Sequence, residues 1–193
     1  PSIEASPASA PTPIAALNTT PSALPATPTR AAVAAPPVEV ERGNLDRREL
    51  ALTFDCGGHA NGTAEIRAAR RDADVHVTFF LIGDWVRAYP DLAREIAARQ
   101  EIASHSDTHP DYVTLTDAQI VADLDASDRA FRDILGRSAK PMWRAPSGSR
   151  DDRVLAAAAR AGWTQHIFWS LARDAQGSLV TGDSGDWRDF TPH

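Results

Sequence analysis

Leu52-Thr53-Phe54-Asp55-Cys56-Gly57-Gly58 is the stretch that decides the fold, because an apolar run ends there in an acid, a thiol and two glycines. This pattern is typical of a buried strand whose carboxyl end delivers reactive side chains before the backbone turns sharply. In (β/α) barrels the chemistry lies at that end of the strands. Asp55 is therefore a candidate catalytic residue. The alternative is a carboxylate that only caps the turn before the glycines.

Two histidines follow at a spacing that suits a metal site. His105 and His109 are four residues apart, and on one turn of helix this separation directs both imidazoles to the same side. Two imidazoles, a third protein ligand and an open water position make a hydrolytic metal centre. The alternative is a pair of solvated surface histidines. A third stretch, residues 144–148, carries the proline and glycine of a shaped loop after an arginine.

Short strands alternate with helices along the chain. The pattern predicts strands over 48–54, 75–82, 101–103, 142–143 and 166–169, and helices over 63–71, 90–99, 116–135 and 149–162. Thr116 and Gln119 form a capping-box signature at the start of the longest helix. Alternating strands and helices imply a parallel sheet, and functional residues at strand ends imply a barrel. We therefore predict an α/β fold, a (β/α) barrel, with an inserted loop or hairpin over residues 171–182.

The first 46 residues differ in composition from the rest of the chain. Nine of the 14 prolines precede residue 38, where Glu4 and Arg30 are the only charged residues. Such a segment buries too little apolar surface to offset the entropy of ordering, so we predict a disordered linker over 1–46 and a folded domain over 47–193. The net charge of −6, with acids among the basic residues, argues against a nucleic-acid partner. The sequence has no run of about 18 apolar residues that would span a bilayer.

Together the three stretches resemble the NodB-type polysaccharide deacetylases, carbohydrate esterase family 4. The first motif of that family is T-F-D-D-G, in which the first acid is the general base and the second binds the metal beside two histidines. The resemblance implies that Asp55 is the base, that His105 and His109 bind the metal, and that Cys56 replaces the metal-binding acid. A thiolate ligand favours Zn²⁺, with Co²⁺ or Ni²⁺ as alternatives. The alternative is that Cys56 is a small buried residue that does not bind the metal.

Two later motifs extend the resemblance. R-x-P-x-G matches residues 144–148, which implies that Arg144 orients the catalytic acid and that the amide of Ser147 faces the oxyanion. D-x-x-D-W matches residues 183–187, which implies that Asp186 pairs with Arg144 and that Trp187 lines the pocket. The last family motif, a strand carrying the histidine that protonates the leaving group, is not found. The resemblance therefore covers about residues 48–188 and predicts a distorted barrel, incomplete at its C-terminal end.

The activity implied by the resemblance is metal-dependent removal of acetyl groups, mainly N-acetyl, from a polysaccharide such as peptidoglycan or a chitin-like glycan. One alternative is an O-acetyl esterase of the xylan type. Another, favoured by Cys56 and by the missing motif, is a catalytically impaired barrel that acts as a carbohydrate-binding module. The family and the proline-rich linker imply export to the cell envelope or beyond. The oligomeric state is not predicted.

Overall fold

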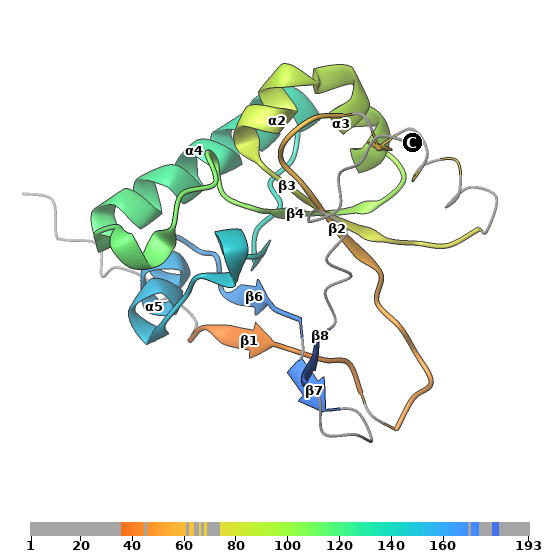
Figure 1. Ribbon diagram of the computed structural model, residues 1–193. Coiled ribbons are helices and arrows are strands. Elements are labelled where there is room, and N and C mark those ends of the chain that lie inside the picture. Colours follow the sequence, from red (N-terminus) through yellow and green to blue (C-terminus); the bar gives the residue numbers. More distant parts are fainter. Residues whose placement is uncertain are drawn as a thin grey trace, which may run out of the picture. The chain divides into compact units, whose positions relative to one another are not determined.

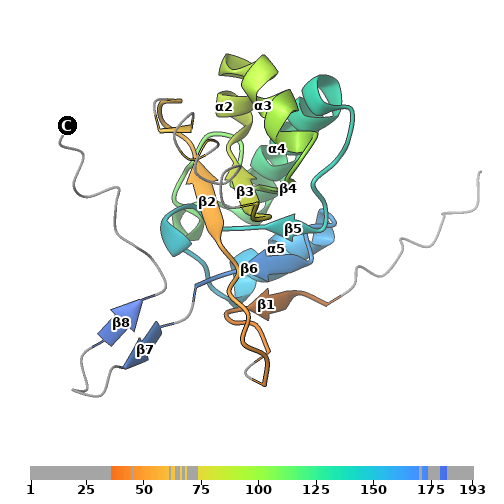
Figure 2. The same cartoon turned by 90° about the vertical axis from the view of Figure 1, so that its right-hand side faces the viewer.

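The computed structural model describes residues 36–44, 46–60, 62, 63, 66, 68, 74–169, 171–173 and 179–181, all within the unit Val33–His193. Six strands of these residues form one sheet in the order β1-β6-β5-β4-β3-β2, and each neighbouring pair is parallel (Figures 1 and 2). The strands are β1 (Val38–Val40), β2 (Thr53–Cys56), β3 (Thr78–Leu81), β4 (Glu101–Ser104), β5 (Met142–Trp143) and β6 (Gln165–Ile167). This arrangement confirms the predicted α/β class with a parallel sheet.

The register of β2, β3 and β4 sets the position of the site. Cys56 pairs with Leu81, and Leu81 pairs with Ser104, so the three strands end at the same level. Because parallel strands run in one direction, the residues that follow them emerge side by side at one edge of the sheet. Those residues begin with Gly57, Ile82 and His105.

Four helices accompany the described strands: α2 (Gly83–Ala88), α3 (Pro90–Ala97), α4 (Asp117–Leu135) and α5 (Asp152–Arg160). The long helix α4 packs against the other three (Figure 1). Its N-terminus has the predicted capping box, in which the Thr116 hydroxyl accepts from the Gln119 amide and the Gln119 side chain accepts from the Thr116 amide. The helix ends at Gly136, whose φ of 72° is the left-handed conformation that glycine adopts without strain.

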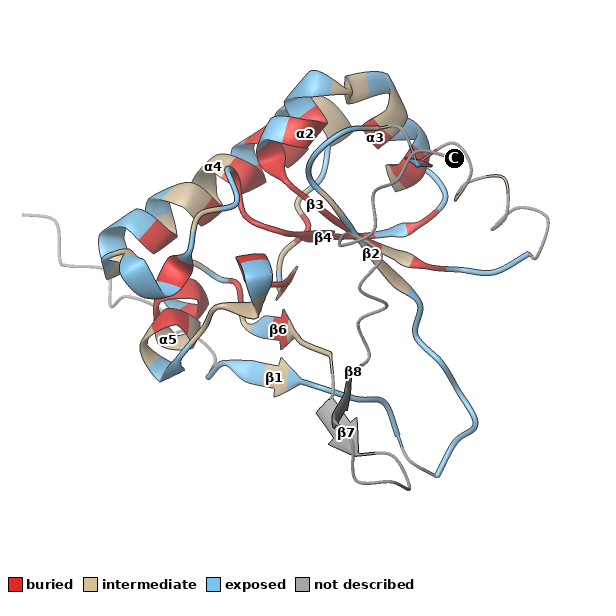
Figure 3. Cartoon of the chain, in the orientation of Figure 1, coloured by how far each residue is buried: buried red, intermediate tan, exposed pale blue. Residues whose placement is uncertain are grey.

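The hydrophobic core lies between the helices and the middle of the sheet (Figure 3). In β3, Phe79, Phe80 and Leu81 are fully buried, as expected for a central parallel strand covered on both faces. Helix α4 contributes apolar residues of one face, Ile120, Leu124 and Phe131. Burying each such side chain contributes about 1.5–3 kcal/mol. The edge strands β1 and β2 are instead half-buried or exposed.

The structure corrects several of the elements predicted from the sequence. Strand β2 begins and ends later than the predicted 48–54, so that Asp55 and Cys56 belong to the strand itself. Helix α2, which has only six residues and no side-chain cap, was not predicted. The predicted helix over 149–162 begins later, as α5 at Asp152, because its N-cap is Asp151, whose carboxylate accepts from the Val154 amide at 2.8 Å.

Strand β1 lies inside residues 1–46, which the composition assigned to the linker. Its Val-Glu-Val alternation pairs with β6 from Val38 to Val40, so the last part of the predicted linker belongs to the sheet. Residues 1–35 lie outside the described residues, as does most of the predicted helix over 63–71. The predicted hairpin is confirmed by β7 (Leu171–Arg173) and β8 (Leu179–Thr181), which pair antiparallel. Among the described helices, none has the length and apolar character needed to cross a membrane.

Candidate functional site

A pocket of about 390 Å³ lies at the carboxyl ends of β2, β3 and β4. It is lined by residues from these three strand ends: Asp55, Gly57, Gly58, Ile82, His105 and His109. The acid and the two histidines that the sequence singled out are thus brought together, although 50 residues separate Asp55 from His105. A larger pocket, of about 460 Å³, lies at the opposite, amino ends of the strands, beside Thr78 and Glu101. Because it contains none of these three side chains, the smaller pocket is the candidate active site.

Arg144 holds one oxygen of the Asp55 carboxylate. Its Nη1 donates to Asp55 Oδ1 at 2.6 Å and its Nη2 donates to Thr53 Oγ1 at 3.1 Å. The guanidinium is itself fixed, because Nε donates to the Ile167 carbonyl at 3.0 Å and the group lies 3.9 Å from the centre of the Phe80 ring. Arg144 is only 5% exposed, whereas the Asp55 side chain is 37% exposed. The arginine therefore orients the carboxylate and leaves its second oxygen open to the pocket.

His105 presents an unprotonated nitrogen to the pocket. Its Nδ1 lies 3.0 Å from the Arg144 carbonyl, which can only accept, so Nδ1 carries the proton. Its Nε2 lies 3.6 Å from Asp55 Oδ2. Burial lowers the pKa of His105 although the nearby Asp55 opposes this effect, which keeps the imidazole neutral. A neutral imidazole whose other nitrogen donates to a carbonyl is the usual form of a metal-binding histidine.

His109 lies beside His105 but not on a helix with it. The two ring centres are 5.0 Å apart with an angle of 73° between the planes. The expected helical turn is wrong, because Ser106 and His109 have left-handed φ values of 76° and 61°. Each such conformation costs about 1–2 kcal/mol for a residue with a side chain. The loop is closed by its own serine, since Ser106 Oγ accepts from the His109 amide at 2.8 Å.

Cys56 is not brought to the histidines. Side chains alternate along a strand, so Thr53 and Asp55 of β2 face Arg144 while Phe54 and Cys56 point to the other side and pack against the core. Burial, with a further effect of Asp55, raises the pKa of the Cys56 thiol from 9.0 to about 12. At neutral pH the side chain is therefore a protonated, half-buried thiol.

The donor set can be compared with what a divalent cation needs. In the part of the chain that the structure describes, no group of three or more His, Cys, Asp or Glu side chains is arranged to hold a metal ion. The imidazoles of His105 and His109, which both line the pocket, fit such an ion as a pair of ligands. The predicted set of two histidines and Cys56 does not fit, because the thiol packs on the opposite face of β2.

Three predicted site residues remain, and the structure describes only one of them. Ser147 is exposed, with a φ of 54°, in the short turn η2 (Pro146–Gly148), and it does not line the pocket. Asp186 and Trp187 lie outside the described residues. Their predicted roles, like that of Ser147, stay predictions.

One histidine that the sequence left without a role supports the Arg144 loop. His166 is fully buried, and its Nε2 accepts from the Ala145 amide at 3.1 Å. Its Nδ1 therefore donates to Glu39 Oε2, at 2.8 Å, and Arg150 donates to both Glu39 oxygens at 2.8 and 2.9 Å. Burial lowers the pKa of His166 to about 4, so the ring is neutral. No local pattern reveals this contact, because Glu39 and His166 are far apart in sequence.

The fold and the site define a parallel α/β protein with an arginine-held carboxylate and a histidine pair at the carboxyl edge of its strands. Comparison with known proteins identifies the group. Residues 42–166 match the family described as polysaccharide deacetylase, and the chain belongs to that family.

Three similar proteins illustrate the relation. The peptidoglycan-N-acetylmuramic acid deacetylase PdaA of Bacillus subtilis is 33% identical over 67% of this chain and 49% of its own length. A chitooligosaccharide deacetylase of Bradyrhizobium is 33% identical over 64% of this chain and 57% of its own. The structure of BA3943 from Bacillus anthracis, described as a CE4 family pseudoenzyme, has a TM-score of 0.64 at 28% identity and covers 69% of this chain and 47% of its own. The chain thus spans about half the length of these proteins. The similarity to the BA3943 structure confirms the predicted fold, a distorted (β/α) barrel of the NodB type.

Proposed function

We propose that this chain is a metal-dependent polysaccharide deacetylase domain that hydrolyses the acetamide of N-acetylated sugars. The observation that carries the proposal is the convergence of Asp55, His105 and His109 on one pocket at the carboxyl ends of three parallel strands. The names of the relatives, which include a peptidoglycan-N-acetylmuramic acid deacetylase and chitooligosaccharide deacetylases, support an acetylated glycan of the cell envelope or outside the cell as the substrate.

Asp55 is the proposed general base. Arg144 occupies Oδ1, so Oδ2 is the oxygen that accepts a proton from the water that attacks the acetyl carbonyl. Because Arg144 is anchored to the Ile167 carbonyl and packed over Phe80, the carboxylate keeps one orientation through the reaction. Such fixed orientation lowers the entropy cost of reaching the transition state.

His105 and His109 are the residues proposed to hold a divalent cation. When bound there, the cation would supply Lewis-acid activation of water and of the acetyl carbonyl. His105 is prepared for this role by its Nδ1 hydrogen bond to the Arg144 carbonyl, which directs Nε2 into the pocket. Zn²⁺ suits imidazole ligands, as do Co²⁺ and Ni²⁺.

Acetate release tests the proposed activity. The purified protein with Zn²⁺ or Co²⁺ should release acetate from N-acetylated chito-oligosaccharides or peptidoglycan fragments, and Asp55→Asn should reduce the rate by about 100-fold or more. Asp133→Asn, an exposed carboxylate on α4, is the matched control and should keep the wild-type rate. Equal rates for Asp55→Asn and wild type would exclude Asp55 as the base.

Metal analysis tests the ligands. One divalent ion should bind per chain, His105→Ala should lose it, and His76→Ala should keep it, because His76 lies at the amino ends of the strands. Retention of the ion by His105→Ala would refute the proposed ligand pair.

A second candidate is a barrel that binds glycan without turnover. It is favoured by the packing of the half-buried Cys56 against the core, by the lack of a three-donor metal cluster among the described residues, and by the similarity to the BA3943 pseudoenzyme. A mutant of that protein is described as having restored enzymatic activity. Binding of chito-oligosaccharides by a protein that takes up no metal and releases no acetate would support this candidate.

A further inference from the structure

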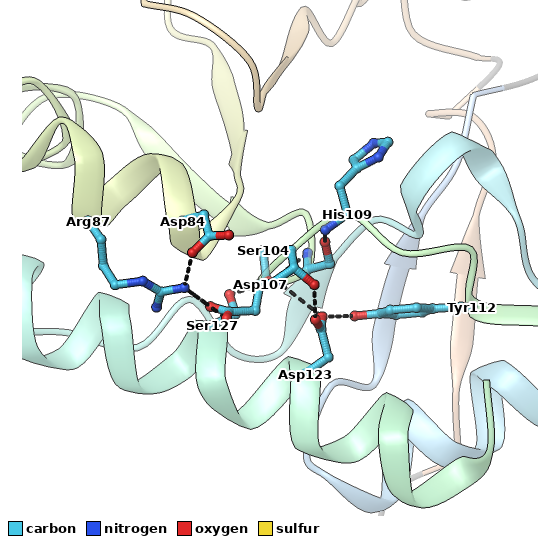
Figure 4. Close-up of polar contacts among 10 residues, drawn as sticks. Asp84, Arg87, Ser104, Asp107, His109, Tyr112, Asp123 and Ser127 are labelled. Atoms are coloured by element: carbon cyan, nitrogen blue, oxygen red, sulfur yellow. Dashed lines mark hydrogen bonds and ion pairs between the residues drawn. The ribbon is translucent and has the colours of Figure 1, made fainter.

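Helix α4 contacts Ser104 and Asp107 (Figure 4), which precede and follow His105 in the sequence. Asp123 and Ser127 are four residues apart on this helix, so their side chains lie on the same face. Ser127 Oγ lies 2.8 Å from Ser104 Oγ, just before His105. Asp123 contacts the residues just after it, beginning with the Asp107 amide at 2.8 Å. One turn of α4 therefore spans the start of the histidine loop, residues 105–109.

Asp123 accepts three hydrogen bonds from the chain next to the two histidines. Oδ2 accepts from the Asp107 amide and, at 2.7 Å, from the Tyr112 hydroxyl. Oδ1 accepts from Thr108 Oγ1 at 2.9 Å. Tyr112 is fully buried, and burial followed by the charge of Asp123 raises its pKa, so that its hydroxyl stays protonated and donates. These three donors flank His109 on both sides.

Helix α2 holds the same loop from the other direction. The Asp84 amide donates to the Asp107 carbonyl at 3.0 Å, and Arg87 donates to both Asp107 carboxylate oxygens at 2.8 Å. Asp107 is thereby bound by α4 through its amide and by α2 through its oxygens (Figure 4). The loop is clamped between two helices.

The histidines need such a clamp. Ser106 and His109 have left-handed backbone conformations that a free loop would leave, and His109 is exposed at the rim of the pocket. An exposed side chain follows its backbone, so the distance of 5.0 Å between the two rings depends on how the loop is held.

We infer that Asp123 is a positioning residue for the histidine pair, acting through Asp107, Thr108 and Tyr112. The inference rests on the proposed function only where it takes His105 and His109 as ligands of a divalent cation. Removing a group that hydrogen-bonds a ligating histidine commonly weakens metal binding about 10- to 100-fold. Asp123 acts one step further away, through the loop, so we expect the lower end of that range, about tenfold.

The test replaces Asp123 with asparagine. Asp123→Asn keeps the size of the side chain but places an NH₂ donor against groups that also donate. Asp125→Asn is the matched control, because Asp125 lies on the same helix and faces Lys140 at 3.6 Å. Two quantities are measured: amide hydrogen exchange over residues 105–112 in metal-free protein, and Zn²⁺ affinity by competition with a chromophoric chelator.

In Asp123→Asn we expect the amides of Asp107 and His109 to exchange about tenfold faster and Zn²⁺ to bind about tenfold more weakly. Asp125→Asn should behave like wild type. Thr108→Val removes one of the three hydrogen bonds at an exposed position and replaces Asp123→Asn if that variant fails to fold. It should change both quantities in the same direction by a smaller factor.

The outcomes separate the inference from the proposed function. If Asp123→Asn folds and its amide hydrogens over residues 105–112 exchange at the wild-type rate, the inference is overturned, whether or not the protein binds metal. If wild type binds no Zn²⁺, the proposed function fails, while the exchange measurement still decides the role of Asp123. If wild type binds Zn²⁺ and the variant binds it equally well, the inference fails and the proposed function stands.

Discussion

Glu39→Gln should destabilise the protein although the residue lies on an edge strand and does not line the pocket. The Glu39 carboxylate accepts three hydrogen bonds, one from His166 and two from Arg150, and its side chain is 22% exposed. Glutamine retains one acceptor oxygen and turns a donor toward either His166 or Arg150. The substitution therefore leaves at least one donor without its partner.

The expected cost follows from the burial of the two partners. His166 is fully buried, and an unsatisfied buried donor costs about 1–3 kcal/mol. Arg150 is 23% exposed and keeps its contact with the Phe168 ring at 3.7 Å, so its share is smaller, about 0.5 kcal/mol. The sum is about 1.5–3.5 kcal/mol, which lowers the melting temperature by about 3–14 °C for a domain of this size.

Thermal and urea unfolding measure the effect, with Glu41→Gln as the control. Glu41 is exposed on the same segment, and its substitution should stay within about 0.5 kcal/mol of wild type. A Glu39→Gln protein that melts within about 1 °C of wild type would show that β1 does not hold His166 through this carboxylate.

Three further predictions concern single residues. Gly83→Ala would place a Cβ 2.0 Å from Asp107 Oδ1, so urea unfolding should show a loss of about 1–3 kcal/mol, whereas Gly43→Ala, with no atom within 4 Å, should show almost none. The pKa of His166 is lowered from 6.5 to about 4, so the contribution of the neutral ring to stability is complete above pH 6.5. That contribution is lost as the pH falls toward 4, by up to about 3 kcal/mol. The free energy of unfolding of His166→Asn should therefore change less steeply with pH between about 6.5 and 4.5 than that of wild type, and an equal pH dependence would contradict the assignment. Because the pKa of Cys56 is about 12, native protein should react with a thiol reagent about 1,000-fold more slowly than urea-unfolded protein, and similar rates would place the thiol at the surface.

The sequence predicted the class of fold because the elements have strong local signals. The β-branched and aromatic run before residue 82 became the buried strand β3, and the box of Thr116 and Gln119 became the start of α4. Elements without such signals were missed or displaced. Helix α2 has six residues and no side-chain cap, and β1 has a composition close to that of the linker but gains stability from pairing with β6.

The sequence by itself determined which side chains meet at the candidate site, because an acid after an apolar run and two histidines four residues apart are local patterns: Asp55, His105 and His109 line one pocket. Only the tertiary structure decided which neighbours join them. The alternation of β2 turns Cys56 into the core and Asp55 toward Arg144, 89 residues away. The packing of α4 likewise brings Asp123 to the histidine loop. Contacts between distant segments follow from register and packing, which no short pattern in the chain encodes.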